Sequence, residues 1–330
     1  MMRRTLRFLS ASDVARALPV REAVEVMKEA FRQLSAGEAV VPPRTHIEAG
    51  RPPGDAIFMS SYSPAAGRMG VKVITLFGGN AALGLPLIQA IMVVLDAATG
   101  SPLAVMDGTS LTAIRTGAAS GAATDILARP EAAVAAIFGA GPQARTQLEA
   151  VCAVRPIRRA KVFDVRAEQA EALAREMSQA LGIPVEPAAS PSDALAGADV
   201  VCTATTSPAP VFADGDLAPG VHINAIGSYK PSVREIPGET VRRARVVVDH
   251  LASALAEAGD LLIPMSQGLI GKDHIHAELG EIIGGRKKGR ESPGQVTLFK
   301  SVGIALQDLL AADKVLAAAQ RLNLGTELQI

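Results

Sequence analysis

The chain has 330 residues, which suggests about two domains, and 48% of them are apolar, enough for two hydrophobic cores. The 33 lysines and arginines balance the 33 aspartates and glutamates, and this zero formal charge argues against nucleic-acid binding, which needs a basic footprint. Cys152 and Cys202 allow no disulfide framework, and neither they nor the five histidines show metal-ligand spacing, so we expect no metal and a reducing cytoplasm.

One amphipathic helix and several strands are predicted for the first hundred residues. Residues 20–36 place Val24, Met27 and Phe31 on one helical face, and Gly37 ends the pattern. Strand-like segments follow, mostly antiparallel in character. They cover residues 57–61, 70–76, 87–95 and 103–107.

Residues 73–95 carry no charged side chain and reach the length of a membrane span, about 20 residues. Gly78-Gly79-Asn80 and Gly84-Leu85-Pro86 interrupt this stretch, so we expect a strand, a loop and a second strand. The basic start at residues 1–7 is followed by polar residues rather than by a secretory apolar region. No membrane segment is therefore predicted.

From residue 110 onward, helices and strands alternate as in a doubly wound sheet. A small-residue helix over residues 110–128 leads into an apolar strand at 133–138, and a helix follows at 143–154. The last helix, about residues 302–322, is apolar enough to pack on the first domain. Further strands are predicted at residues 161–164, 200–204, 222–226 and 246–249.

A glycine-rich turn joins the strand 133–138 to the next helix. Its sequence is Gly139-Ala140-Gly141-Pro142-Gln143-Ala144. Gly139 permits a tight turn, Gly141 lets the backbone approach a pyrophosphate, and Ala144 packs the helix on the strand. The pyrophosphate would lie on the helix N-terminus. The alternative is a surface turn in an alanine-rich domain.

Asp164 ends the next strand, 25 residues after Gly139, where a ribose-binding carboxylate belongs. Its charge repels a 2′-phosphate and favours NAD(H), whereas Arg166 could hold a phosphate and leaves NADP(H) open. The alternative role for Asp164 is to cap the following helix.

Polar and small residues at the carboxyl ends of later strands complete the predicted cofactor site, because ligands gather there in doubly wound sheets. Ser301 is equally well explained as a helix N-cap. The residues predicted to bind the cofactor from these strand ends and the segment after them are Thr203, Ala204, Thr205, Ile226, Ser228 and Ser301, and Thr116, in the small-residue helix, could reach the cofactor phosphates.

The fold class that follows is α/β. A Rossmann-like doubly wound NAD(P)-binding domain is predicted for residues 121–311. An α+β domain is predicted for residues 1–120 together with 312–330, and the family resemblance described below implies that this domain binds substrate and forms the dimer.

Lys72 lies in an apolar strand, where a cation is costly unless it has a partner or a task. Burial can lower the pKa of a lysine by as much as about 3 to 5 units, which would make Lys72 an acid or base near neutrality. The alternative is a lysine at the sheet edge that extends to water.

Arg115 is surrounded by small side chains, and its planar guanidinium suits a bidentate substrate carboxylate. The alternative is an ion pair with Asp107 or Asp125. Arg44 follows Pro42-Pro43 and is predicted as a second carboxylate contact, the alternative being a surface arginine.

Taken together, these segments resemble the ornithine cyclodeaminase and mu-crystallin family over nearly the whole chain. That resemblance implies a homodimer whose first domains pair, with the active site facing the Rossmann-like domain. Its motifs are Pro42-Pro43-Arg44, Lys72, residues 104–108, Arg115 to Ser120, Gly139 to Ala144, residues 197–200, 222–227, 278–281 and 299–303.

Within that family, the resemblance favours the reductase branch over the lyases. Ornithine cyclodeaminases carry an aspartate after the Asn-Ala-x-Gly strand, where this chain has Tyr229. The acidic residue that those lyases use for the distal amine also lacks a counterpart near residues 57–59. Tyr229 is instead expected to border the substrate.

The resemblance therefore implies reduction of a cyclic ketimine, Δ1-pyrroline-2-carboxylate or its six-membered homologue, to L-proline or L-pipecolate with NADH or NADPH. Arg115 and Arg44 would bind the carboxylate, and Lys72 would bind it or help supply the proton. The alternatives are ornithine cyclodeaminase, alanine dehydrogenase and a non-catalytic binder of small acids.

Overall fold

The computed structural model describes residues 5–330, and the chain divides into two compact units. Unit 1 combines Met1–Arg115 with Ile304–Ile330, and unit 2 is Thr116–Gly303. Residues 1–4, which belong to the basic start of the chain, lie outside the described residues. The division falls at residues 115 and 303, whereas the sequence placed it at 120 and 311. The functions assigned to the two domains stay predictions.

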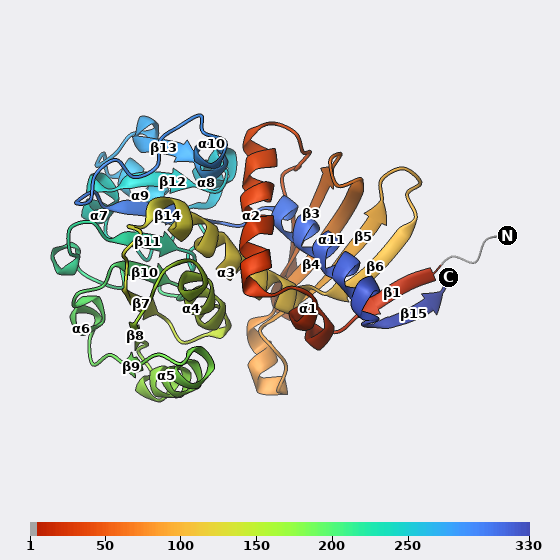
Figure 1. Ribbon diagram of the computed structural model, residues 1–330, viewed down its shortest axis with the longest axis horizontal. Helices are drawn as coiled ribbons and strands as arrows, with labels where there is room; N and C mark the ends of the chain where they lie inside the picture. Colours follow the sequence, from red (N-terminus) through yellow and green to blue (C-terminus); the bar gives the residue numbers. More distant parts are fainter. Residues whose placement is uncertain (1–4) are drawn as a thin grey trace. The chain divides into compact units, whose positions relative to one another are not determined.

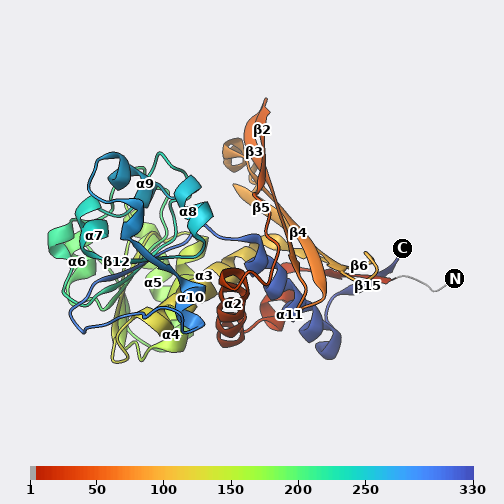
Figure 2. The same ribbon diagram turned by 90° about the horizontal axis from the view of Figure 1, so that it is seen from above.

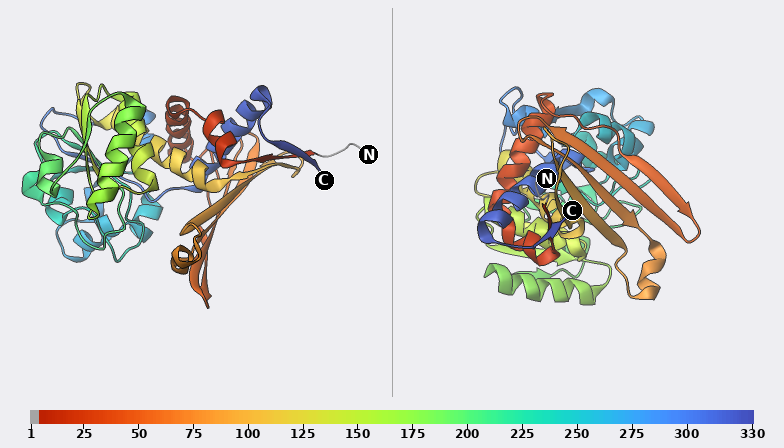
Figure 3. Two further views of the ribbon diagram at one scale, coloured as in Figure 1. Left: turned by 90° about the horizontal axis from the view of Figure 1, so that it is seen from below. Right: turned by 90° about the vertical axis from the view of Figure 1, so that its right-hand side faces the viewer.

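Unit 1 is built on a seven-stranded sheet in the order β15-β1-β6-β5-β4-β3-β2 (Figure 1). β1 and β6 pair in parallel, and the other neighbours pair antiparallel. The β2–β3 hairpin, orange in Figure 3, forms one edge. The strands are β1 (Thr5–Leu9), β2 (Thr45–Gly50), β3 (Pro53–Ser63), β4 (Arg68–Leu76), β5 (Ile88–Asp96), β6 (Pro102–Asp107) and β15 (Thr326–Gln329).

Helices cover one face of this sheet. α11 (Ala305–Leu322) lies across β3, β4 and β5, and α2 (Val20–Ser35) packs on α11 (Figure 2). α1 (Ala11–Ala17) contacts α11 and β6. The predicted last helix began at residue 302, but α11 starts three residues later, with Ile304 at the N-cap.

Residues 73–95 fold as predicted, into strand, loop and strand, with a short 3₁₀ helix η1 (Gly78–Leu83) in the loop. Within residues 5–330, no helix has both the length and the apolarity of a membrane span.

Unit 2 is a doubly wound sheet of parallel strands in the order β13-β12-β14-β11-β10-β7-β8-β9. The order reverses between β7 and β10, which marks the switch point where such sheets bind ligands. The strands are β7 (Val134–Phe138), β8 (Arg159–Phe163), β9 (Val185–Pro187), β10 (Val200–Thr203), β11 (His222–Ala225), β12 (Arg245–Val248), β13 (Ile275–Glu278) and β14 (Thr297–Lys300).

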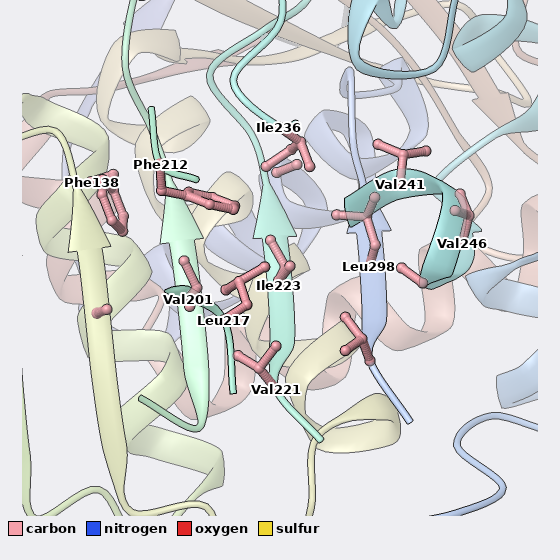
Figure 4. Packing of buried hydrophobic residues seen from close by; sticks show 14 of the residues in the cluster. Phe138, Val201, Phe212, Leu217, Val221, Ile223, Ile236, Val241, Val246 and Leu298 are labelled. Atoms are coloured by element: carbon pink, nitrogen blue, oxygen red, sulfur yellow. The ribbon is translucent and has the colours of Figure 1, made fainter. Parts of the chain in front are cut away.

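Both faces of this sheet are buried, which explains the uninterrupted apolar run of β7. Ala136 and Phe138 contribute to the core on one face, shown in Figure 4, and Ala135 and Ile137 to the core on the other. The predicted α/β fold class is confirmed. The helices of unit 2 are α4 (Pro142–Val154), α5 (Ala167–Leu181), α6 (Pro191–Leu195), α7 (Gly238–Arg243), α8 (Leu251–Glu257), α9 (Gly259–Ser266), α10 (Leu279–Ile283), η2 (Asp214–Asp216) and η3 (Lys272–His274).

α3 (Gly108–Leu127) belongs to both units, because the boundary falls inside it. Arg115 is the last residue of unit 1 before the boundary, and Thr116 is the first residue of unit 2. One predicted substrate contact and one predicted cofactor contact are therefore consecutive on a single helix.

Candidate active site

Lys72 is buried in the interior of the unit 1 sheet, with only 1% of its surface exposed. Its Nζ lies 2.9 Å from Oδ1 and 2.8 Å from Oδ2 of Asp308, on α11. Because β3 and β5 flank β4 on both sides, the alternative of a sheet-edge lysine extending to water is wrong. The pairing instead satisfies both charges inside the protein.

Gly70 explains how α11 comes close enough for this contact. It is buried on β4, two residues before Lys72 and on the same face of the sheet. A Cβ at this position would lie 2.9 Å from a methyl of Leu309 and 2.8 Å from the carbonyl oxygen of Val93. The absence of a side chain lets the helix that carries Asp308 approach the strand that carries Lys72.

Arg115 binds the same carboxylate. Its Nε donates to Oδ1 of Asp308 at 2.9 Å, and one terminal nitrogen donates to Oε1 of Gln307 at 3.0 Å. The alternative pairings are wrong: Asp107 accepts from the backbone of Ser110, and Asp125 pairs with Arg155.

This cluster of Lys72, Arg115 and Asp308 contains two cations and one anion, all buried. When all three are ionised it carries one surplus positive charge, and an uncompensated buried charge is costly. The side-chain amide nitrogen of Gln307 is also buried, with no hydrogen-bond partner among the described residues. The cluster is therefore suited to an anionic ligand with acceptor oxygens.

Burial and neighbouring charges shift the pKa values of Lys72 and Asp308. Burial lowers the pKa of Lys72 to about 8, and the charges of Arg115 and Arg44 add to this, while Asp308 opposes it. Burial alone would raise the pKa of Asp308, but Arg115 and Lys72 outweigh it and hold that pKa below its ordinary value. Lys72 can therefore exchange a proton near neutrality.

Arg44 is half-buried rather than fully on the surface, and its charge reaches Lys72. Its direct contact with a substrate carboxylate stays a prediction. Sequence reasoning missed Asp308 and Gln307, because an acid in the first turn of a helix is ordinarily explained by the helix dipole. The available signal was a polar pair, Gln307 and Asp308, among the apolar residues of the first two turns of the helix.

In unit 2, the glycine turn lies at the switch point of the sheet. Gly139 has φ +95°, and a Cβ there would lie 2.7 Å from the carbonyl oxygen of Ala204, beyond the end of β10. Gly141 is the N-cap of α4, with open space where a Cβ would be and no side-chain cap. The first turn of α4 also lacks an acidic residue. These features fit a pyrophosphate on the helix N-terminus.

Pro142, Gln143 and Ala144 form the first turn of α4. The side-chain oxygen of Gln143 is buried and has no hydrogen-bond partner among the described residues. Ala144 is fully buried in the core beneath the turn, as expected for the helix-packing position of the fingerprint.

Asp164 anchors the glycine turn instead of capping α5. Its Oδ2 accepts from the backbone of Ala140 at 2.8 Å, and its Oδ1 accepts from the backbone of Arg166 at 2.9 Å. Arg166 occupies the N-cap position of α5, so the capping alternative for Asp164 is wrong. The guanidinium of Arg166 is 59% exposed and lies 3.6 Å from the Asp164 carboxylate.

The strand-end residues Thr203, Thr205 and Ser228 surround a carboxylate that sequence reasoning missed, Glu235. It accepts from the hydroxyl of Thr203 at 2.9 Å, and from the backbone of Thr205 at 2.6 Å and of Ser228 at 3.2 Å. Burial, then Asp260, raises the pKa of Glu235. Ala204 and Ile226 lie beside these contacts and are half-buried.

Two other predicted hydroxyl groups are engaged within the protein. Ser228 donates its hydroxyl to the carbonyl oxygen of Val233 at 2.7 Å, and Ser301 donates to Asp249 at 2.7 Å. The N-cap alternative for Ser301 is wrong, because Ile304 holds that position. Tyr229 is half-buried, with the Nζ of Lys230 5.9 Å from its ring centre. Thr116 is buried on α3.

The two cysteines and one group of possible metal ligands are weaker candidates for a functional site. Burial raises the pKa of both Cys152 and Cys202 to about 12, so neither is an activated thiol. Among the described residues, His46, Glu48 and Asp55 bring three possible ligand atoms within 4.8 Å of one another at the edge hairpin. Nothing else in the structure marks a metal at that place.

The fold and the site together define a Rossmann-type, dinucleotide-binding α/β protein whose unit 1 contains a buried cationic cluster. The chain belongs to the ornithine cyclodeaminase/mu-crystallin family, whose sequence model matches residues 4–321. The family resemblance drawn from the sequence is confirmed.

Three named proteins are similar to this chain over nearly its whole length. A Δ1-pyrroline-2-carboxylate reductase of Bacillus cereus is 37% identical over 97% of this chain and 99% of its own length. The structure of the Thermococcus litoralis Δ1-pyrroline-2-carboxylate reductase in complex with NADH and L-proline is 44% identical, with a TM-score of 0.94 over 97% of this chain and 99% of that one. An archaeal alanine dehydrogenase dimer with bound NAD is 35% identical, with a TM-score of 0.92 over 99% of this chain and 100% of that one.

Proposed function

We propose that the protein reduces Δ1-pyrroline-2-carboxylate to L-proline with NADH, and that it accepts the six-membered homologue to give L-pipecolate. The observation that carries this proposal is the buried cluster of Lys72, Arg115 and Asp308, whose surplus positive charge suits a small carboxylate. The proposal is supported by the similarity to Δ1-pyrroline-2-carboxylate reductases, one of which has a structure in complex with NADH and L-proline.

The reaction takes up one hydride and one proton. The hydride forms a C–H bond at C2 of the imine, the C=N π electrons become the N–H bond pair with the added proton, and the dinucleotide is oxidised from NADH to NAD⁺. Bound dinucleotide supplies the hydride, and the side chains of the protein hold the substrate and manage the proton.

Arg115 is proposed to bind the substrate carboxylate, with Arg44 as a second contact. Asp308 and Gln307 hold the guanidinium by two hydrogen bonds, which fix its plane. The terminal nitrogen that these bonds leave over can donate to the ligand. Fixing the carboxylate orients C2 before hydride transfer, and such orientation can supply a large part of a rate enhancement.

Lys72 is proposed to hold the proton that makes the imine electrophilic. Its pKa of about 8 keeps it mostly protonated at neutral pH, yet weak enough as a base to release a proton. Asp308 keeps the ammonium in place and balances part of the charge. Tyr229 is proposed to border the substrate, in the position where the lyases of the family have an aspartate.

The dinucleotide is proposed to bind at the switch point of unit 2, with its pyrophosphate on the glycine turn and its adenosine ribose beside Asp164. The negative charge of Asp164 favours NAD(H), in agreement with the NADH and NAD named for the two similar structures. The exposed guanidinium of Arg166 leaves use of NADPH open.

A homodimer is proposed from the second face of the unit 1 sheet. Val71, Val73 and Val93 lie half-buried on the face opposite α11, and Ile91 is 49% exposed there. A second copy would remove these apolar side chains from water. The alanine dehydrogenase described as a dimer supports the same assembly. Light scattering in solution tests whether the protein is a dimer.

A cytoplasmic location stays a prediction.

Alanine dehydrogenase is the second candidate function, favoured by a similar archaeal protein of that name. Ornithine cyclodeaminase is disfavoured by Tyr229, which cannot act as the carboxylate of the lyases.

One experiment distinguishes the ketimine reductase, alanine dehydrogenase and ornithine cyclodeaminase activities. Purified protein is mixed with NADH, or separately with NADPH, and with Δ1-pyrroline-2-carboxylate or with pyruvate and ammonia, and loss of reduced dinucleotide is followed. A parallel sample with L-ornithine and NAD⁺ is assayed for ammonia. Oxidation of NADH with formation of L-proline supports the proposal, whereas ammonia release from ornithine or preference for pyruvate would reject it.

A further inference from the structure

We propose that Glu235, braced by Asp260 and Lys300, is a positioning residue for the nicotinamide half of the cofactor site. The inference rests on the proposed use of a dinucleotide. In a doubly wound sheet, one mononucleotide half binds on each side of the switch point. The glycine turn and Asp164 belong to the β7–β9 side, so the other half falls to β10, β11 and β14.

Glu235 ties together the chain segments that leave β10 and β11. Its Oε2 accepts from the Thr203 hydroxyl at 2.9 Å and the Gly227 backbone at 2.8 Å, and its Oε1 accepts from the Thr205 backbone at 2.6 Å. The Ser228 backbone donates as a fourth group at 3.2 Å. A single fully buried carboxylate thus sets the path of two neighbouring strand ends.

Asp260 and Lys300 hold Glu235 itself in place. Oδ1 of Asp260, on α9, accepts from the backbone of Glu235 at 2.7 Å and of Ile236 at 2.9 Å. Oδ2 of Asp260 lies 2.9 Å from the Nζ of Lys300, at the end of β14, and both side chains are fully buried. Lys300 also donates to the carbonyl oxygen of Ser228. The network therefore reaches the ends of three adjacent strands.

The segments between this network and the glycine turn are tightly packed. A Cβ on Gly227 would lie 2.3 Å from the carbonyl oxygen of Thr205 and 2.6 Å from Oε1 of Glu235. On the other side of the same loop, a Cβ on Gly139 would lie 2.7 Å from the carbonyl oxygen of Ala204. A shift of the Glu235 carboxylate would therefore move residues 204–205, which line the switch point.

The substitution that tests this role is Glu235→Gln, which keeps the shape but removes the charge and presents a donor to backbone N–H groups that need acceptors. Binding of NADH and of ADP-ribose, which lacks nicotinamide, is measured to the full-length protein by calorimetry. We expect the Kd for NADH to rise about tenfold, and the Kd for ADP-ribose to change by less than about twofold.

Asp199→Asn is the matched control. Asp199 also accepts from two backbone groups, Ala133 at 2.8 Å and Val134 at 3.0 Å, but at the amino ends of β7 and β10. This variant should lose thermal stability and keep the wild-type ratio of the NADH and ADP-ribose Kd values. A selective loss of NADH binding in both variants would overturn the proposal.

Equal weakening of NADH and ADP-ribose binding by Glu235→Gln would show a merely structural role, and unchanged binding of both would exclude positioning. If Glu235→Gln does not fold, Thr203→Val is the second variant, because valine is similar in size to threonine but lacks the hydroxyl that donates to Glu235. The same selective loss of NADH affinity is then expected, at about two- to threefold. Wild-type protein that binds NADH but leaves Δ1-pyrroline-2-carboxylate unreduced rejects the proposed function and leaves this test valid. Failure of wild-type protein to bind NADH overturns both.

Discussion

The ammonium of Lys72 and the carboxylate of Asp308 are 236 positions apart in the sequence, and their closest atoms lie 2.8 Å apart with both side chains almost fully buried. A buried ion pair adds little to stability, since desolvation offsets the attraction. A second cation, Arg115, on the same carboxylate makes the cluster less favourable for folding alone. The arrangement is better explained by a ligand anion that completes it.

Arg115→Ala should lower kcat/KM for the ketimine by about 100-fold or more, because it removes one or two charge-assisted hydrogen bonds of roughly 1.5–3 kcal/mol each. The Kd for NADH should stay within about twofold. Steady-state kinetics and NADH titration check this. Arg68→Ala is the control, since Arg68 also joins β4 to α11, through Asp313 at 2.8 Å. Equal loss of NADH affinity in Arg115→Ala would contradict the substrate role.

Lys72→Met should lower kcat by about 100- to 10,000-fold, the usual range for loss of a general acid, in a protein that still folds. Folding is expected because Asp308 keeps its bond to Arg115, so no unpaired charge remains. Circular dichroism and NADH binding confirm the integrity of the variant. Rates close to wild type would remove Lys72 from the mechanism.

The pKa of Lys72 predicts the alkaline side of the pH profile. If the ammonium form is active, kcat/KM should fall as the pH rises through about 8, where Lys72 loses its proton. Asp308→Asn removes the charge that raises the pKa of Lys72, so the fall should begin at a lower pH.

Kinetics from pH 5 to 10 measure both profiles, and Asp313→Asn, on the same helix, should leave the profile in place. An increase in rate through pH 8 would show that the neutral amine is the active form, and an unshifted profile in Asp308→Asn would exclude coupling between the two groups.

Lys72 and Arg115 could be predicted from the sequence because each is a cation in an apolar or small-residue segment, which is a local signal. Asp308 could not, because its partners are 193 and 236 positions away and its place in the first turn of α11 has an ordinary explanation. The buried contacts that define its role exist only after α11 packs on β4.

The fold shows the same limit. The β7 run and the Gly139 turn were predictable, since a strand buried on both faces is apolar throughout. β2 and β15 were not predicted, because they are exposed edge strands without clear alternation. Glu235 lies in a loop, and its buried contacts exist only where the ends of β10, β11 and β14 meet.

Asp164→Asn should shift the preference toward NADPH about tenfold, because it removes the charge that repels a 2′-phosphate. Asparagine keeps a carbonyl oxygen that can accept from the backbone of Ala140, so the glycine turn should stay anchored. Asp164→Ser removes this acceptor as well and should weaken both dinucleotides. The ratio of kcat/KM for NADPH and NADH is the measurement. If that ratio is unchanged in Asp164→Asn, the ribose is recognised elsewhere.

Gly70→Ala should disturb catalysis without any change to a charged group. The new Cβ would meet Leu309 of α11 and the backbone oxygen of Val93, and the latter cannot move without distorting β5. Overpacking of this kind costs about 1–3 kcal/mol and would push α11 away from β4. We expect a lower Tm, a lower kcat with Δ1-pyrroline-2-carboxylate and an unchanged Kd for NADH, which is proposed to bind unit 2. Gly50→Ala is the control, since a Cβ there meets no atom within 4 Å. Wild-type kcat in Gly70→Ala would show that the contact between Lys72 and Asp308 does not depend on this close approach.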